Sequence, residues 1–335
     1  DNYTILAGAF TPVQNQALAS LDPASLPNGS YTLRLTATDI GGRTTQTSRV
    51  LEINTAAKTS AYTNYVTDLS VTLAGVPIAI SRFYSSLDAN VRGTFGFGWQ
   101  WAGLETRVAT NLEPTGQEVE GVFNAFRPGT RVYLNLPEGN RVGFTFAPTR
   151  HEQAGVVWYS PAWTSDAGVD YQLASADAAL DLVNGQLVEK RTGLPYNPES
   201  GRFAGSDYTL FGPDDVAYEI STRQGLQTII TPSMKRLRVS DSGIVAPDGS
   251  RLSFQWDHQG RLSAVITDDG SRVVYAYDSR GNLMSVYSTA TDQRTVYGYQ
   301  SERAHLLEDI LAPAGQPSWQ VTYSDDGRFL SRDPI

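Results

Sequence analysis

The chain alternates apolar and polar residues over short stretches that are separated by turn-forming residues. In residues 272–288, RVVYAYDSRGNLMSVYS, one side of the first stretch carries Val273, Tyr275 and Tyr277. The alternation breaks at Asp-Ser-Arg-Gly-Asn and resumes at Leu283. A period of two residues indicates β-strands, because successive side chains of a strand point to opposite faces. The pattern therefore predicts a β-hairpin.

The break has the composition of a type I turn. Asp278 stands at its first position and Gly281 at its fourth, which are the residue types preferred there. The Asp carboxylate accepts hydrogen bonds from backbone N–H groups of the turn, and the glycine adopts the left-handed conformation freely. Equivalent pairs are Asp257 with Gly260 and Ser324 with Gly327. These aspartates are predicted to cap turns rather than to act as catalytic acids.

An aromatic residue precedes each turn at a nearly regular spacing. Trp256 is followed by Tyr277 after 21 residues, by Tyr299 after 22 more and by Tyr323 after a further 24. Such a repeat indicates a unit that stacks on its neighbours, because an isolated hairpin is marginally stable in water. Burying each ring against the next hairpin contributes about 1.5–3 kcal/mol. We therefore predict an all-β fold of stacked antiparallel β-hairpins.

Residues 62–250 also read as short strands joined by turns. Hairpin turns are expected at 75–77, 137–140 and 184–185, and Gly96 and Gly98 in FGFGW allow rings or backbones to approach closely. One stretch, residues 177–191, also fits a helix. Its alternation and its Asn-Gly pair favour a hairpin instead.

The first 54 residues have a different pattern. Tyr31, Leu33 and Leu35 lie on one side of a strand in GSYTLRLTATDIGG, which resembles the closing strands of an immunoglobulin-like or fibronectin-like sandwich. A complete sandwich of this kind takes about 100 residues, so this segment is predicted to be part of one. Residues 55–61, small and polar, are a predicted linker.

The repeats resemble those of the YD-repeat, or RHS-repeat, family, which is named for its Tyr-Asp pair. The resemblance rests on FQWDHQGRLSAVITDDGSRVVYAYDSRGNLMSVY and is extended by PSWQVTYSDDGRFLSRDPI. Upstream, LAGVPIAISRFYSSLDANVRGTFGFGWQW is similar to the segment that introduces such repeats in bacterial members. We accordingly assign 251–335 to YD repeats and 62–250 to the N-terminal part of the same β-sheet region. The repeat-turn residues are Trp256, Asp257, Gly260, Tyr277, Asp278, Gly281, Tyr323 and Gly327.

The resemblance implies a large antiparallel sheet that spirals as a strip and forms part of a shell. In characterised relatives the shell encloses a C-terminal toxin or effector, and in teneurins it serves adhesion at cell surfaces. It further implies a secreted or surface-exposed bacterial protein whose partners are the remainder of the parent chain and its effector. One unit departs from the family pattern: Gln300 replaces the Asp and Arg303 stands where Gly is expected, so that hairpin should turn differently.

Charge and composition exclude several kinds of partner. Charged residues make up 18% of the chain and the net charge is −9, which argues against binding to nucleic acid or to an anionic membrane surface. The absence of cysteine excludes disulfides, zinc ribbons and thiol catalysis. No run of about 18 apolar residues is present, so no membrane-spanning helix is expected.

The sequence offers no recognisable catalytic constellation. His151, His258 and His305 are the only histidines, and none stands beside a carboxylate at metal-ligand spacing. Adjacent aspartates in a strand or turn point apart or into water, and no Ca²⁺-binding D-x-D-x-D-G loop is present. These adjacent pairs lie at 214–215, 268–269 and 325–326. We predict no catalytic residue, no cofactor and no metal, while a hydrolase site assembled from distant residues stays open as an alternative.

The tryptophans raise a second functional possibility. An extracellular adhesion or carbohydrate-binding module would need exposed aromatic rings on which sugars stack, with cell-surface glycans or proteins as partners. The candidates are Trp99, Trp101, Trp158 and Trp163. Packing in a β core is the competing and favoured interpretation for each of them, because aromatic residues dominate such cores.

The turn assignment makes a first prediction. Gly281→Val should lower the free energy of unfolding by at least about 1–2 kcal/mol, because a non-Gly residue is forced into the left-handed conformation. Ser279→Ala, inside the same turn, should be nearly silent. Urea denaturation of the two variants checks this, and equal effects would mean that the turn is misassigned.

Overall fold

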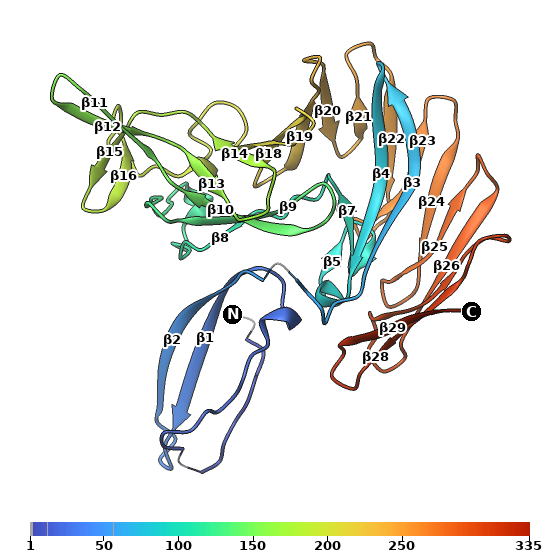
Figure 1. The fold of residues 1–335 in the computed structure, drawn as a ribbon, viewed down its shortest axis with the longest axis horizontal. Helices are drawn as coiled ribbons and strands as arrows, with labels where there is room; N and C mark the ends of the chain where they lie inside the picture. The colour runs from blue at the N-terminus through green and yellow to red at the C-terminus, as the bar shows by residue number, and fades with distance from the viewer. Residues whose placement is uncertain (1–2, 12, 56) are drawn as a thin grey trace.

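The fold consists of β-strands joined by turns. The computed structural model describes residues 3–11, 13–55 and 57–335, and within them no α-helix occurs (Figure 1). The only helical elements in these residues are short 3-10 turns at Pro23–Ser25, Ser86–Asp88, Glu118–Glu120 and Pro198–Ser200. The all-β fold class predicted from the alternation is confirmed.

The largest element is one antiparallel sheet of 14 strands, which we call the strip. From its second strand onward, each strand pairs with the next one along the chain, so the strip is a continuous meander of hairpins, as predicted. Figure 1 shows it running from the yellow to the red part of the chain. Its strands are β14 (Gln172–Ser175), β17 (Tyr208–Phe211), β18 (Ala217–Ser221), β19 (Gly225–Ile230), β20 (Arg236–Ser240), β21 (Gly243–Val245), β22 (Arg251–Trp256), β23 (Leu262–Thr267), β24 (Arg272–Tyr277), β25 (Leu283–Ser288), β26 (Gln293–Tyr299), β27 (Leu307–Leu311), β28 (Trp319–Tyr323) and β29 (Phe329–Pro334).

Strand pairing in the strip continues through the boundary assigned at residues 250 and 251. Val245 of β21 pairs with Arg251 of β22, so the predicted repeats and the strands before them share one sheet. The strip begins at Gln172, and the strands between residues 62 and 171 form separate, smaller sheets.

These smaller sheets differ in size and pairing. One contains β3 (Thr63–Leu73), β4 (Val76–Ser85) and β7 (Trp99–Ala102), and a short one contains β5 (Arg92–Gly93) and β6 (Gly96–Phe97). Two four-stranded sheets complete the set. They contain β8 (Ala109–Thr110), β9 (Arg131–Asn135), β10 (Arg141–Phe146) and β13 (Trp163–Ser165), and β11 (Thr149–Gln153), β12 (Val156–Ser160), β15 (Leu180–Val183) and β16 (Gln186–Glu189).

Each repeat of the strip carries a β-bulge at the same place. The register shifts just before the aromatic residue that ends the first strand of each hairpin. A bulge inserts one residue on one strand and re-aims the side chain beside it. The residues after the shift are Trp256, Tyr277, Tyr299 and Tyr323.

The re-aimed aromatic residue bonds to the preceding hairpin. Tyr299 donates its hydroxyl hydrogen to the carbonyl oxygen of Leu283 at 3.0 Å, and Tyr323 donates to Leu307 at 2.9 Å. Tyr277 makes the same bond to the carbonyl of Leu262. Each repeat is thus joined to its predecessor by a side-chain hydrogen bond in addition to the backbone pairing.

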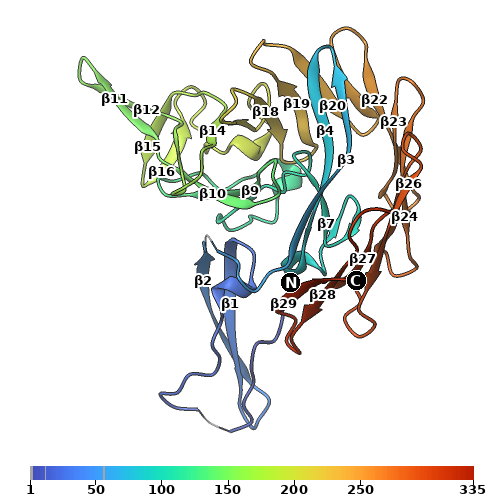
Figure 2. The same cartoon turned by 45° about the vertical axis from the view of Figure 1, so that its right-hand side comes forward.

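The smaller β3–β4–β7 sheet lies beside the strip (Figure 2), and aromatic residues fill the space between them. The ring centroids of Trp99, in β7, and Tyr297 are 5.2 Å apart. Those of Phe95, in the turn between β5 and β6, and Tyr275 are 4.8 Å apart. Gly98 has a φ of 74°, and a Cβ there would overlap the ring of Tyr84, which is the close approach expected for FGFGW. The core is therefore built between two sheets that come from distant parts of the sequence.

A buried ion pair lies in this interface. The Arg82 guanidinium donates to the two carboxylate oxygens of Asp68 at 2.5 and 2.8 Å, and the two side chains are only 1% and 3% exposed. Asp68 is the extra residue of a bulge in β3, which aims its carboxylate at Arg82. Tyr275 donates to Asp68 at 3.0 Å and Arg82 donates to the Tyr297 hydroxyl at 2.9 Å, so two repeats of the strip complete the cluster.

The N-terminal segment forms a two-stranded hairpin, β1 (Gly29–Thr38) and β2 (Thr44–Ile53). Among the described residues no third strand pairs with it, and Leu35 on its apolar side is 51% exposed. Its base is held by Glu52, which accepts hydrogen bonds from Arg131 at 2.8 Å and from Tyr133 at 2.6 Å. Its place in a sandwich stays a prediction.

Removing one member of the buried ion pair should be strongly destabilising. Arg82→Met leaves the Asp68 carboxylate buried without its counter-ion, which costs about 3–5 kcal/mol of unfolding free energy. Arg150→Met is the matched control, because Arg150 pairs with Glu152 on the surface with both side chains about half exposed. The urea midpoint should drop for the first variant and barely move for the second; similar shifts would contradict the assigned role of the pair.

Candidate functional site

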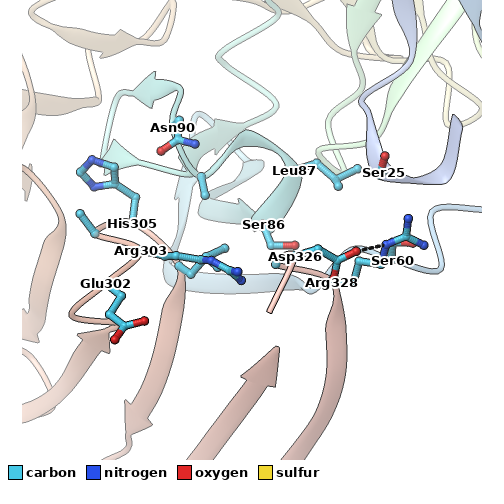
Figure 3. Close-up of a pocket in the computed structure, with 14 residues that line it drawn as sticks. Ser25, Ser60, Ser86, Leu87, Asn90, Glu302, Arg303, His305, Asp326 and Arg328 are labelled. Carbon is cyan, nitrogen blue, oxygen red and sulfur yellow. Dashed lines mark ion pairs between the residues drawn. The ribbon is translucent and has the colours of Figure 1, made fainter. Parts of the chain in front are cut away.

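A polar cavity of about 580 Å³ lies where three parts of the chain meet. These parts are the segment flanking the N-terminal hairpin, the turn after β4, and the last turns of the strip (Figure 3). Its labelled lining residues are Ser25, Ser60, Ser86, Leu87, Asn90, Glu302, Arg303, His305, Asp326 and Arg328.

The cationic groups of this cavity are engaged with the protein. Arg328 forms ion pairs with Asp22 at 2.9 Å and with Asp326 at 2.8 Å. Arg303 donates to the backbone carbonyl of Ser324 at 2.7 Å. Two carboxylates offset the charge of Arg328, so the cavity does not present the cluster of uncompensated cations that an anionic ligand requires.

His305 is held in one tautomer by its neighbours. Asn282 uses its amide nitrogen to donate to Asp278 at 2.9 Å and to the carbonyl of Ala304 at 2.8 Å, so its amide oxygen faces His305 as an acceptor. The Nδ1 of His305, 2.6 Å away, therefore carries the proton. The ring also stacks on Phe97 with a centroid distance of 3.8 Å.

The serine beside this histidine is not arranged as a nucleophile. Ser86 Oγ accepts a hydrogen bond from the backbone N–H of Tyr62 at 2.9 Å, and within the described part of the chain no hydrogen bond joins it to His305. Figure 3 shows the two side chains in separate parts of the cavity. A nucleophile and its base must lie within hydrogen-bonding reach, so this pair lacks the geometry of a hydrolase site.

The contacts around the cavity instead fasten the end of the strip. Tyr84 at the end of β4 donates to the carbonyl of His305 and accepts from the backbone N–H of Leu307, both at 2.9 Å. Phe329 of β29 donates its N–H to the carbonyl of Ser60 at 3.0 Å. The cavity is thus a junction that holds three segments together.

The repeat-turn residues lie in a row on the side of the strip where the two strands of each repeat hairpin are joined. Gly260, Gly281 and Gly327 have positive φ values of 74°, 91° and 84°. The Asp257 carboxylate accepts from the backbone N–H groups of residues 259 and 261, and Asp278 does the same for residues 280 and 282. These aspartates therefore occupy turn-capping positions and are engaged by backbone donors.

Neighbouring turns of the row also contact one another. Asn282 donates to Ala304 of the next turn, and Arg303 donates to Ser324 of the one after it. Gln300 and Arg303 build a longer loop that is closed by a hydrogen bond from the Gln300 N–H to the Leu306 carbonyl, which differs from the Asp-to-Gly turns as expected.

Two of the four tryptophans proposed for sugar stacking are buried. Trp99 is 0% and Trp101 is 3% exposed, so both pack in the core, as the favoured interpretation expected. The alternative of sugar stacking is wrong for these two, because a buried ring offers no face to a glycan. Trp158 is half-buried and stacks on His151. Trp163 is half-buried among Phe126, Phe146 and Tyr208. These two are placed in local packing rather than in a shared surface.

The acidic pairs at residues 268–269 and 325–326 are turn elements. Asp269 accepts from Ser271 N–H at 2.9 Å, and Asp268 accepts from Arg251 N–H at 2.9 Å. In residues 3–11, 13–55 and 57–335, no group of three or more His, Cys, Asp or Glu side chains is placed to hold a metal ion.

Sequence reasoning missed the Arg82–Asp68 cluster. Its available signal was a charged residue inside the otherwise apolar run IAISRFYSS, since a charge in a buried strand requires a partner. The partner itself, bulged out of register in β3, has no local signature.

No protein-family model and no curated protein sequence matches this chain. Solved structures that resemble it include the Photorhabdus luminescens Tc holotoxin pore with mutated TccC3, with 11% identity and a TM-score of 0.29 over 62% of this chain and 13% of that one. TcdB2-TccC3 gives 12% identity and a TM-score of 0.35 over 95% and 17% of the two chains. The N-terminal domain of effector protein SpvB from Salmonella typhimurium strain LT2 gives 9% identity and a TM-score of 0.28 over 81% and 99%. This chain spans less than a fifth of the first two, and likeness at this level carries no statement about function.

The helical elements of the described residues are far too short and polar to cross a membrane. This matches the absence of a long apolar run in the sequence.

His305 makes stability depend on pH. Burial lowers its pKa, with Asp278 opposing and nearby Arg280 reinforcing that shift. Since the pKa is lower in the folded than in the unfolded chain, the neutral ring contributes stability above about pH 6.5, and this contribution is lost as the pH falls through the folded-state pKa.

The corresponding variant should reduce this dependence. The urea midpoint should fall less between about pH 7.5 and about pH 5 in His305→Gln than in the wild type. His258→Gln is the control, because that side chain is exposed in the turn after β22. If the urea midpoint of His305→Gln falls with pH as steeply as that of the wild type, the pH dependence comes from other groups.

Proposed function

We propose that this chain is a structural wall segment of a larger, secreted or surface-exposed YD-repeat protein, in which the strip encloses or displays a C-terminal toxin or effector. The observation that carries the proposal is the repeated bonding of the strip. Every repeat from β22 onward brings its own turn, its own bulge and its own aromatic link to the preceding hairpin.

The two edges of the strip support an extended wall. β14 and β29 each pair with a strand on one side only, so each leaves a row of backbone groups on the other. A further hairpin at β29 would find bonding groups like those that β27 offers to β28. A wall of this design grows by repetition and needs no separate core for each addition.

The chemistry of the described residues supports an enclosing rather than a reacting role. The turn aspartates are occupied by backbone donors, and the polar cavity at the end of the strip is crossed by structural contacts. We therefore propose no enzymatic activity, no metal and no cofactor for this chain. Its proposed partners are the remainder of the parent protein and the effector.

A second candidate function is adhesion through glycans. The specific observation in its favour is Trp256, which is 38% exposed beside a cavity of about 810 Å³. This residue was expected to be part of a repeat turn alone.

Imaging of the longest natural protein that contains this sequence tests the wall proposal. Single-particle microscopy should show the strip as part of the wall of a hollow particle. Density for the C-terminal region of that longer protein should lie inside the particle. An open strip with the C-terminal region outside it would overturn enclosure and leave display, in which that region is held on the outer face. A C-terminal region that makes no contact with the strip would overturn both.

Protease protection gives an independent readout on the same protein. If the wall encloses the C-terminal region of the parent protein, that region should resist cleavage by an added protease. Arg82→Met loosens the packing of the β3–β4–β7 sheet on the strip and should therefore speed cleavage of that region. Arg150→Met should behave as the wild type. Equal cleavage in all three proteins would contradict enclosure.

A further inference from the structure

A second, larger cavity lies between the strip and the loop that follows β7. It has a volume of about 810 Å³, within the range of small-ligand sites. One wall is the loop at residues 104–108, and the other is formed by the ends of β18, β19, β20 and β22. It does not share lining residues with the polar junction cavity.

Trp256 provides an aromatic surface in this cavity. Its indole N–H donates to the carbonyl oxygen of Asp241 at 2.6 Å, which fixes the orientation of the ring. At the equivalent position of the next repeat, the Tyr277 ring is covered by the Arg261 guanidinium, 4.1 Å from its centroid. Within the described part of the chain, no guanidinium and no aromatic ring stacks on Trp256.

The exposure of Trp256 is not required by the repeat. Tyr277, Tyr299 and Tyr323 make the same bond to the preceding hairpin from a smaller ring, and all three are less exposed. Trp256 is also the only tryptophan of the described residues among the exposed large apolar side chains. The indole therefore adds apolar surface to the cavity beyond what holding the hairpin needs.

Hydrogen-bonding groups surround this surface. Gln227 donates to the side-chain oxygen of Gln224 at 2.9 Å, which leaves the oxygen of Gln227 as an acceptor and the amide nitrogen of Gln224 as a donor. Asp241 adds a carboxylate that accepts no hydrogen bond from the described residues. Arg107, also in the lining, is paired with Glu105 at 2.6 Å.

We propose that this cavity binds a neutral carbohydrate, with a pyranose ring stacked on Trp256 and its hydroxyls bonded to Gln224, Gln227 and Asp241. A sugar ring has an apolar C–H face and a polar rim, which match an aromatic surface edged by amide and carboxylate groups. The charged lining residues are Arg107 and Arg223 on one side of the balance and Glu105 and Asp241 on the other, so the site carries no net charge that would favour an ionic sugar. The site is separate from the wall contacts, so its test stands apart from that of the proposed function.

The test uses the full chain on an array printed with neutral and acidic oligosaccharides, followed by titration with the best neutral glycan. The wild type should bind at least one neutral glycan, and Trp256→Ala and Gln227→Ala should each weaken binding by about tenfold or more. Trp319→Ala is the matched control, because it removes a half-buried tryptophan of β28 that does not line this cavity, and it should leave binding unchanged.

Trp256→Tyr distinguishes loss of the indole surface that a sugar would stack on from loss of the fold. In the other repeats a tyrosine at this position donates to a backbone carbonyl of the preceding hairpin, so a tyrosine here can donate to the carbonyl of Asp241. This variant should therefore retain the wild-type urea midpoint. Its smaller ring should give glycan binding between that of the wild type and that of Trp256→Ala. Binding that survives in a folded Trp256→Ala protein, binding to acidic glycans alone, or an array without any bound glycan would each overturn the proposal.

Discussion

Two charges removed from water lie between the β3–β4 hairpin and the strip, and the packing of these two parts depends on how those charges are satisfied. Burying Arg82 or Asp68 alone would cost several kcal/mol, so each tolerates burial only in the presence of the other. Tyr275 and Tyr297 bond to the pair from two different strands of the strip. Apolar rings can slide over one another at small cost, whereas this bonding pattern fits one alignment. The ion pair therefore fixes the register between segments about 200 residues apart in the chain.

A second, repeated interaction gives the strip its cohesion. Backbone hydrogen bonds join neighbouring strands. In addition, the hydroxyls of Tyr277, Tyr299 and Tyr323 each donate to a carbonyl of the preceding hairpin. A typical bond of this kind contributes about 0.5–1.5 kcal/mol, and it recurs with every repeat. The last three turns support the same arrangement, since Asn282 bonds to Ala304 of the next turn and Arg303 bonds to Ser324 of the one after it.

The sequence predicted the strip where local and periodic signals coincide. Alternation and an aromatic residue before a turn recur together from Trp256 onward, and in the first two units the turn runs from Asp to Gly. Each of these signals has a direct structural cause. Upstream, β17 to β21 join the same sheet without that combined signature, although a bulge recurs beside Ile220. The aromatic partners of Trp99 and the ion-pair partner of Arg82 could not be predicted, because both depend on which distant strands face each other. The exposure of the Trp256 ring was not predicted for a related reason. Its position in the repeat accounted for an aromatic residue there, and the residues that surround it come from other parts of the chain.

The bulge that recurs beside each aromatic residue has a geometric consequence. A bulge bends its strand and increases the local twist, and here the same distortion is applied once in every hairpin. Because the bulges occupy equivalent strands, the bend of the strip is determined by the single unit and its length by the number of units. Loss or duplication of a whole unit in evolution would then shorten or lengthen the strip without redesign of any contact.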